Sequence, residues 1–520
     1  MSMNNKKTKI LLLILIPIMG VIILAASIFG IAYGYLNRNT IKLDFNENIT
    51  YQTFRYFGAS SCWNSRHLAS DEDLETQQML NDLVYGDNGL QLSIYRYNIG
   101  AGSAELDLPN YNESTSTISF FKSENYVNAS SFLDVNNYDI SRDKYYLSSF
   151  KLALETNNVK KIVLFCNSPH YKLTKNNKTH ADNAHEDNLA PENYEAFANY
   201  VLICSTLIYD WLGTIGYQNL EIEISPVNEP QWSWGGDKDT QEGCHFDSAS
   251  LAAFYDVFYK TLNEYNAKNN THFKMDIYES GNYKLGLASS KNKEYFKAFS
   301  KYEYFDTLDS ISMHSYAADT DKSIRRQFMR YFKKFDKDFK MSEYCIMEGG
   351  VDPSVSQGIK SAKVLMQDLN IMNTVEWSWW LSVAYGGWED GLVYFNRETK
   401  EINLYYRYYM YGQFMKYIDY GDVRIKADIH DLYDIGGVDS VGFKKPDGTV
   451  VLVILNDNNK TKTIKLESSR FTQAKLVENY ENTYWKESEK AFDGEFLIQP
   501  NSVTTIILKD DLSNQVQHEE

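Results

Sequence analysis

Alternating apolar and polar positions indicate short β-strands along most of the chain. Residues 220–225, with the sequence LEIEIS, are the clearest case, because every second side chain is apolar and a period of two is typical of a strand. Asn228-Glu229-Pro230 follows shortly afterwards. Pro230 lacks the amide hydrogen that a strand ladder needs. We therefore expect the strand to end before it, with Glu229 at its carboxyl end.

Seven further segments have the apolar or alternating pattern of strands. They are residues 56–60, 90–100, 161–169, 273–278, 309–316, 339–345 and 374–381. Between them we predict helices at residues 70–86, 143–157, 191–212, 248–266, 322–337, 354–370 and 402–417. Eight strands that alternate with helices predict an α/β fold, a (β/α)8 TIM barrel over residues 56–420. The alternative, an open doubly wound sheet, would bring a glycine-rich phosphate loop, and the sequence shows none.

The pattern changes after residue 420. Strands follow one another without helices, at residues 441–445, 449–455, 462–466, 475–478, 495–498 and 503–508. Pro446-Asp447-Gly448 is typical of a hairpin turn between two of them. We predict an all-β sandwich side domain at residues 421–510 and a polar tail at 511–520. Short strands at 41–43 and 50–54, within residues 38–55, are expected to join this domain.

Residues 10–35 carry no charged side chain. A helix needs about 20 apolar residues to span a bilayer, and Lys6, Lys7 and Lys9 in front of the run are expected to remain cytoplasmic. We predict that residues 1–37 form a cytoplasmic stub and a transmembrane signal anchor, with the remaining chain outside the cell. The alternative is signal-peptide cleavage near residues 25–27, which would secrete the protein.

The formal net charge of −17, without clustered Lys and Arg, argues against nucleic acid as a partner. His170, His180 and His185 have spacings that match no metal motif, and we expect them to be solvated loop residues. The cysteines lie far apart, without a CxxC pair, and most are predicted to be buried apolar thiols: Cys62, Cys166, Cys204, Cys244 and Cys345. The sequence therefore predicts neither a disulfide framework nor a metal centre.

Polar and aromatic side chains gather at the predicted strand ends, which face one pocket in a (β/α)8 barrel. The candidate pocket residues are Arg96, Asn98, Asn167, Asn228, Glu229, His314, Tyr316 and Glu343, with Trp63, Trp232, Trp377 and Trp379 around them. Glu229 and Glu343 would face each other across the mouth. Glu348 and Glu376 are rival carboxylates. We expect Glu348 to be a loop residue and Glu376 to be buried and paired.

Two opposed carboxylates are the arrangement that glycoside hydrolysis requires. One has a raised pKa and protonates the leaving oxygen, while the other stays ionised and attacks the anomeric carbon. Arg96 is expected to keep the nucleophile ionised, and Asn228 to bind a sugar 2-hydroxyl. The tryptophans either stack on sugar rings or pack in the core. This chemistry needs no metal and no organic cofactor.

Several motifs resemble glycoside hydrolase family 30, in the branch that includes endo-β-1,6-galactanases. They are FGAS (57–60), LSIYRYNIGAGS (92–103), NSP (167–169), SPVNEPQWSW (225–234), QEGCHF (241–246), HSY (314–316), MSEY (341–344) and YGQFMKYI (411–418). The resemblance implies a retaining mechanism with the catalytic residues on the fourth and seventh strands. It matches Glu229 with the acid/base and Glu343 with the nucleophile, and it implies a side β-sandwich built from the C-terminus and N-terminal strands.

We therefore predict a retaining glycosidase that acts outside the cell on a β-linked polysaccharide or glycan, with endo-β-1,6-galactanase-like activity. The family's substrates leave β-1,6-glucan, glucosylceramide, β-xylosides and glucuronoxylan as alternatives. The loops at residues 103–142 and 386–400 are expected to decide among them. The second loop shows no clear basic pocket for a glucuronate, although Arg397 keeps that substrate open. A non-catalytic sugar-binding surface protein is the alternative of another class, and the presence of both carboxylates counts against it.

Overall fold

The computed structural model describes residues 18–24, 27, 39–108, 110–111, 115–236, 238–286, 291–429 and 436–510. The chain divides into two compact units, Tyr51–Arg424 and Met1–Thr50 with Ile425–Glu520. Most of the membrane anchor predicted at residues 10–35 lies outside the described residues. Among those that are described, no helix combines the length and apolar character needed to cross a bilayer.

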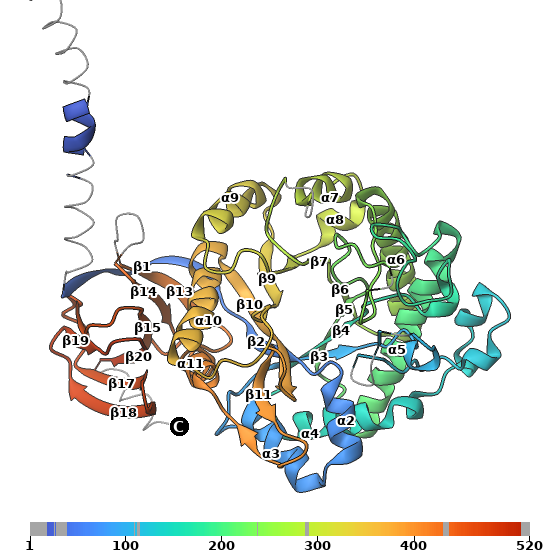
Figure 1. The fold of residues 1–520 in the computed structure, drawn as a ribbon, viewed down its shortest axis with the longest axis horizontal. Helices are drawn as coiled ribbons and strands as arrows, with labels where there is room; N and C mark the ends of the chain where they lie inside the picture. Colours follow the sequence, from blue (N-terminus) through green and yellow to red (C-terminus); the bar gives the residue numbers. More distant parts are fainter. Residues whose placement is uncertain are drawn as a thin grey trace, which may run out of the picture. The chain divides into compact units, whose positions relative to one another are not determined.

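The larger unit is built around parallel strands that form a closed ring (Figure 1). In chain order they are β2 (Tyr56–Ser60), β3 (Ile94–Asn98), β4 (Lys161–Phe165), β5 (Glu221–Ser225), β6 (Lys274–Met275), β7 (Tyr278–Ser280), β8 (Ser310–His314), β9 (Asp338–Glu343) and β10 (Thr374–Ala384). β6 pairs with β5 and β7 pairs with β8, so these two are halves of one broken fifth strand. β10 pairs with β2 and closes the ring. The predicted (β/α)8 barrel is confirmed.

Helices surround the strands (Figure 1). They are α2 (Asn64–Asp71), α3 (Leu74–Tyr85), α4 (Lys144–Glu155), α5 (Tyr194–Thr214), α6 (Ser248–Asn269), α7 (Asn292–Phe299), α8 (Glu303–Thr307), α9 (Lys322–Phe332), α10 (Val355–Gln367) and α11 (Tyr406–Met415). The single helix predicted at 70–86 is two helices, because Asp73 caps a new helix by accepting a hydrogen bond from the Thr76 amide. α7 and α8 were not predicted.

Three segments that carry strand ends or loops differ from the prediction. The fifth strand, predicted at 273–278, is interrupted after β6 and resumes as far as Ser280, which places Glu279 inside the barrel wall. The loop at 386–400 contains most of a small addition to the sheet, β11 (Gly391–Phe395) and β12 (Ile402–Asn403). The loop at 103–142 holds 3₁₀ turns from η1 (Ser103–Glu105) to η5 (Ile140–Asp143).

The smaller unit is one sheet in the order β18-β17-β20-β15-β14-β13-β1-β16-β19. The bounds are β1 (Thr40–Thr53), β13 (Val423–Ile429), β14 (Val438–Lys444), β15 (Val450–Asn456), β16 (Lys462–Lys465), β17 (Gln473–Tyr480), β18 (Thr483–Ala491), β19 (Glu495–Ile498) and β20 (Ser502–Lys509). β1 is one long strand rather than two short ones, and it pairs in parallel with β16. Ile41 and Leu43 of β1 share a buried core with Leu452 of β15 and Ile506 of β20.

Candidate active site

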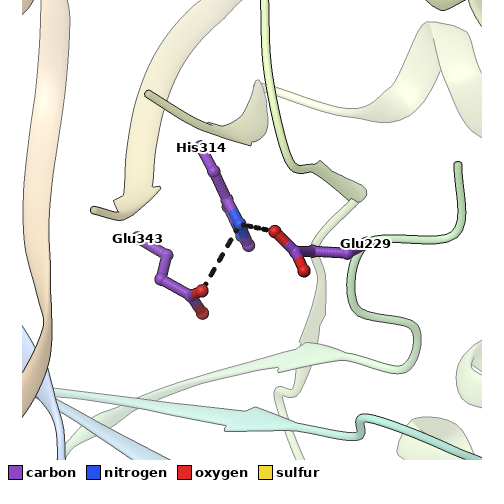
Figure 2. A group of neighbouring side chains, drawn as sticks. All are labelled: Glu229, His314 and Glu343. Carbon is purple, nitrogen blue, oxygen red and sulfur yellow. Dashed lines mark hydrogen bonds and ion pairs between the residues drawn. The ribbon is translucent and has the colours of Figure 1, made fainter. Parts of the chain in front are cut away.

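Glu229, His314 and Glu343 meet at the carboxyl ends of the barrel strands (Figure 2). His314 is the last residue of β8, Glu343 is the last of β9, and Glu229 lies in the turn after β5. One oxygen of each carboxylate and one ring nitrogen all lie within 4.8 Å of one another. Nδ1 of His314 lies 3.0 Å from Glu229 Oε1 and 3.5 Å from Glu343 Oε1. The structure therefore brings together the two carboxylates that the sequence pointed to.

Glu229 is held in an unusual backbone conformation. Its φ of 47° lies in the left-handed region, which few non-glycine residues adopt. The Glu229 amide donates to the Glu279 carbonyl at 3.0 Å, while its own carbonyl accepts from Trp234 Nε1 at 2.8 Å and from the Trp232 amide at 3.1 Å. These bonds fix the turn. Such overdetermined strain concentrates at functional sites.

Glu343 is 4% exposed and is surrounded by donors. Arg96 Nη1 donates to Oε2 at 2.8 Å, and the Tyr316 hydroxyl donates to Oε1 at 3.1 Å. Burial raises the pKa of Glu343, whereas the positive charges of His314 and Arg96 oppose that rise. Both oxygens thus have a donor suited to the ionised form, as expected from the sequence for Arg96.

Glu279 is a third carboxylate that the sequence analysis missed. It is fully buried on β7, and its Oε2 accepts hydrogen bonds from His314 Nε2, at 2.7 Å, and from the Ser342 hydroxyl. Although burial favours neutral histidine, the neighbouring carboxylates, Glu343 first, raise the pKa of His314 to about 10. His314 is therefore an imidazolium at neutral pH and can donate a hydrogen bond through each ring nitrogen.

Five ionisable side chains, which we call the mouth cluster, thus lie together: Arg96, Glu229, Glu279, His314 and Glu343. The predicted fifth strand ends at residue 278, one residue before Glu279. A carboxylate followed by Ser280-Gly281-Asn282, a typical turn sequence, was the signal that could have identified it.

Amide side chains beside the cluster contain buried polar atoms without a hydrogen-bond partner in the described part of the chain. Asn228 Nδ2 donates to Asn167 Oδ1 at 3.1 Å, and this leaves Asn228 Oδ1 and Asn167 Nδ2 unpaired. Both side-chain polar atoms of Gln231 and the indole nitrogen of Trp63 are also unpaired. Unpaired buried groups cost stability, so this concentration is typical of a site that binds hydroxyl groups. Gln231 was missed by the sequence analysis.

The tryptophans separate into two groups. Trp377 and Trp379 have no accessible surface, and their indole nitrogens donate to Asp368 Oδ2 and the Asp390 carbonyl. A ring without an exposed face cannot stack on a sugar, so that part of the prediction is wrong and core packing is the outcome. Trp63 is partly exposed and makes an edge contact with Trp380, with ring centroids 5.2 Å apart.

The rival carboxylates have the surroundings that the sequence predicted. Lys161 Nζ contacts both oxygens of buried Glu376, at 2.9 and 2.8 Å. Glu348 is exposed and pairs with Lys360 Nζ at 2.8 Å. Neither carboxylate belongs to the mouth cluster. Arg397 also pairs away from this cluster, with Asp71.

The prediction for the loop histidines is wrong for His170 and His180. Both are buried, and burial lowers the pKa of His170 to about 3. Their loop folds against neighbouring segments, such as Tyr111, whose hydroxyl lies 3.0 Å from His180 Nδ1. All five cysteines are free and buried, as expected.

Glu242, from the QEGCHF motif, anchors the loop that follows β3. It is 1% exposed and accepts hydrogen bonds from the amides of Ala101 and Ser103, both at 3.2 Å, and from the Thr117 hydroxyl at 2.6 Å. A carboxylate held by several donors at both ends of a loop fixes the course of that loop. The motif therefore has a positional role that the sequence did not reveal.

Comparison with known proteins gives two family matches. The model for O-glycosyl hydrolase family 30 matches residues 38–394, and the model for the glycosyl hydrolase family 30 beta sandwich domain matches residues 421–506. A curated endo-beta-1,6-galactanase of Hypocrea rufa is 25% identical over 406 residues, which cover 74% of this chain and 75% of that protein.

Solved structures share the fold at lower identity. A conserved exported protein from Bacteroides fragilis has a TM-score of 0.75 and 19% identity, over 90% of this chain and 100% of that chain. The catalytic domain of a family 30 xylanase C from Talaromyces cellulolyticus has a TM-score of 0.64 and 17% identity, over 90% and 100%. These similarities extend across both the barrel and the β-unit.

Proposed function

The chain belongs to O-glycosyl hydrolase family 30, and we propose that it is a retaining β-glycosidase with Glu343 as nucleophile and Glu229 as acid/base. The observation that carries this proposal is that oxygens of the two carboxylates lie within 4.8 Å of each other. Retaining glycosidases place their carboxyl groups about 5–5.5 Å apart, whereas inverting ones leave about 6.5–9.5 Å for a water.

The surroundings of each carboxylate support the assignment of roles. Glu343 faces Arg96 and Tyr316, which stabilise the anion that a nucleophile must be. Glu229 contacts His314 through one oxygen. That contact is compatible with either protonation state of Glu229, because an imidazolium N–H can donate to a carbonyl or to a carboxylate oxygen.

In the first step, a Glu343 oxygen attacks the anomeric carbon, and the bond from that carbon to the leaving oxygen breaks. Glu229 gives its proton to the leaving oxygen. The products are a glycosyl ester on Glu343 and an ionised Glu229.

In the second step, Glu229 removes a proton from water, and the water oxygen attacks the same carbon. The ester bond breaks and Glu343 becomes a carboxylate again. Two inversions at one carbon give net retention. The unpaired amide groups of Asn167, Asn228 and Gln231 are placed to bind sugar hydroxyls, consistent with the predicted 2-hydroxyl contact of Asn228.

For the substrate, we favour internal β-1,6-linked galactan. The support is the similarity to the Hypocrea rufa endo-beta-1,6-galactanase, together with the QEGCHF motif whose Glu242 shapes the loop after β3. We also infer action outside the cell, either on the membrane surface or after secretion, because the uncharged run at residues 10–35 follows a lysine-rich start.

The roles are tested with two substitutions and two substrates. Glu343→Gln should lower kcat by about 10,000-fold or more on every substrate, because it removes the nucleophile. Glu229→Gln should be equally inactive on a polysaccharide but should release a burst of dinitrophenol from a dinitrophenyl β-glycoside, whose leaving group needs no proton, before slow hydrolysis of the ester limits further turnover. Glu348→Gln, on the same side of the barrel but exposed, is the control and should behave as wild type. Wild-type turnover by Glu343→Gln would refute the proposal.

The substrate is tested with the full-length protein on β-1,6-galactan, β-1,6-glucan, xylan and aryl β-glycosides. New reducing ends and product sizes are followed over time. A ladder of galactan oligosaccharides supports the proposed endo-galactanase. A ladder from another polymer, or the release of single sugars, would replace that substrate or that mode of action while leaving the roles of Glu229 and Glu343 in place.

A further inference from the structure

Glu279 takes no part in either bond-breaking step, yet it is fully buried in the mouth cluster. It has no accessible surface, and its φ of 54° is left-handed. His314 Nε2 donates to its Oε2 at 2.7 Å, Ser342 donates to the same oxygen, and Arg96 Nη2 lies 3.6 Å from Oε1. A buried carboxylate in a strained backbone conformation lowers the stability of the fold. We therefore expect Glu279 to have a functional role.

The position of Glu279 fixes the direction in which the His314 ring points. An imidazolium ring has one N–H on each side. Because Glu279 fixes the Nε2 side of His314, the Nδ1 side points at Glu229, at 3.0 Å, and at Glu343, at 3.5 Å. Figure 2 shows the ring between the two carboxylates. One histidine thus contacts both of the residues that exchange charge during the reaction.

The second consequence concerns charge. Before the reaction, Arg96 and His314 are positive, Glu279 and Glu343 are negative, and Glu229 carries its proton. After the first step, Glu343 is a neutral ester and Glu229 is negative. The net charge of the cluster is zero in both states. Glu279 is the carboxylate whose charge stays constant throughout.

We propose that Glu279 is a positioning residue that holds His314 as an imidazolium with Nδ1–H directed between Glu229 and Glu343. The positive charge of His314 then lies close to the negative charge, whichever of the two carboxylates carries it. This inference rests on the roles proposed above for Glu229 and Glu343. It assigns no contact with substrate to Glu279.

Other groups also act on the pair formed by Glu279 and His314. They are Arg96 on β3, Glu229 after β5, Asp276 in the break before β7, Tyr255 on α6, Tyr316 after β8, and Ser342 and Glu343 on β9. Of these, Arg96 is a cation and Glu229, Asp276 and Glu343 are carboxyl groups. Among the described residues, Glu279 is the one that contacts Nε2 of His314.

The direction in which Glu279→Gln changes the pKa of His314 can be predicted. Loss of a negative charge destabilises the imidazolium, so the pKa of His314 falls. The imidazolium is therefore lost earlier as pH rises. The alkaline limb of kcat/KM should therefore move to lower pH, by about one unit or more.

The direct experiment is a pH titration of the full-length protein labelled with ¹⁵N-histidine, observed by NMR, with the His314 signal assigned by its loss in His314→Gln. In the wild type, His314 should remain protonated from pH 6 to pH 9, since its pKa is about 10. In Glu279→Gln it should titrate at lower pH, by about one unit or more. Ser342→Ala, which removes a hydrogen bond but no charge from Glu279, should cause a smaller shift.

The kinetic experiment measures kcat/KM against pH on β-1,6-galactan and on a dinitrophenyl β-galactoside. Glu279→Gln should shift the alkaline limb on galactan, where the acid is needed. In a His314→Gln background, Glu279→Gln should add little further shift. Glu279→Asp keeps the charge and should restore most of the wild-type profile. If Glu279→Gln does not fold, Glu279→Asp is used in its place, and a smaller shift of the alkaline limb is expected for it.

An unchanged His314 titration in Glu279→Gln would overturn the inference, and so would an equal kinetic shift with and without His314. Failure of the proposed catalytic roles is recognised separately, because it would appear as turnover by Glu343→Gln. The NMR titration needs no substrate and remains decisive in that case.

Discussion

Two groups of buried charges inside the same barrel have the same composition, two cations and three carboxylates. The mouth cluster lies at the carboxyl ends of the strands. We call the second group the lower cluster, because it lies further towards the amino ends of β4, β9 and β10. Its members are Lys161, Glu223, Asp276, Lys340 and Glu376.

The lower cluster is an alternating chain of ion pairs. Lys161 Nζ lies 2.8 Å from Glu376 and 2.6 Å from Glu223, and Lys340 Nζ lies 2.6 Å from Glu223 and 3.0 Å from Asp276. Each cation thus lies between two carboxyl groups. Although burial opposes ionisation, the two lysines hold the pKa of Glu223 at about 2. Burial raises the pKa of Asp276, at one end of this chain of pairs, to about 7, so the pairing fixes the negative charge of Glu223 most firmly.

The mouth cluster uses different cations. Arg96 and His314 are planar donors with fixed directions, whereas lysine is a flexible point charge. In the mouth, one imidazolium is shared by two carboxylates that lie within 4.8 Å of each other. In the lower cluster, cations separate the carboxylates. Buried charge alone therefore does not identify an active site, and the arrangement around the reacting oxygens does.

The largest expected difference between the clusters is in stability. Lys340→Met removes a cation shared by Glu223 and Asp276, and breaking a buried ion pair in this way costs about 3–5 kcal/mol. Chemical denaturation should show a loss of that size, while kcat per folded molecule stays near the wild-type value. Adding Asp276→Leu should recover part of the loss, because it removes an unpaired carboxylate. A loss of stability below about 1 kcal/mol, or a large fall in kcat, would contradict the structural role assigned to the lower cluster.

The next effect belongs to the mouth and concerns Gly281. A Cβ at this position would lie 2.7 Å from Glu229 Oε1 and also crowd Trp232. Gly281→Ala should therefore displace the acid/base and lower kcat by about 100-fold. Gly286→Ala is the matched control, because a Cβ there meets nothing within 4 Å. Steady-state kinetics with a thermal melt separate lost activity from lost folding, and equal kinetics for both variants would contradict the prediction.

The smallest expected effect is a shift in pH dependence. Arg96→Lys keeps a positive charge but loses the planar guanidinium whose Nη1 donates to Glu343, so the already raised pKa of Glu343 should rise further. Because Glu343 must be ionised to attack, the acid limb of kcat/KM should move to higher pH by about one unit. Arg407→Lys, which alters a buried pair with Glu389, should leave that limb in place. A shift to lower pH in Arg96→Lys would contradict the assigned role.

Much of the fold could be predicted from local sequence pattern. The alternation in residues 220–225 identified β5, and Pro230 showed that Glu229 must follow it. The same reasoning placed Glu343 at the end of β9. Periodicity reports which way each side chain points from its own backbone, and the barrel topology then brings strand ends together.

Other features of the fold could not be predicted from the local sequence pattern. β10 is buried along its whole length, on both faces, so alternation could not show that Trp377 and Trp379 lie in the core. Lys161 lies next in sequence to ordinary strand residues, and only the pairing across the barrel shows that it neutralises Glu376. His170 became buried for the same reason, since the segments that cover it are distant in sequence.

Spacing along the chain was enough to predict the succession of strands and helices, the separate β-unit and the two carboxylates at strand ends. The break in the fifth strand, the contact of Glu279 with Nε2 of His314 and the raised pKa of His314 became visible in the folded chain. Those properties depend on hydrogen bonds and charges contributed by β3, β7, β8 and β9 together, and the free energy of a buried charge is set by its neighbours in space.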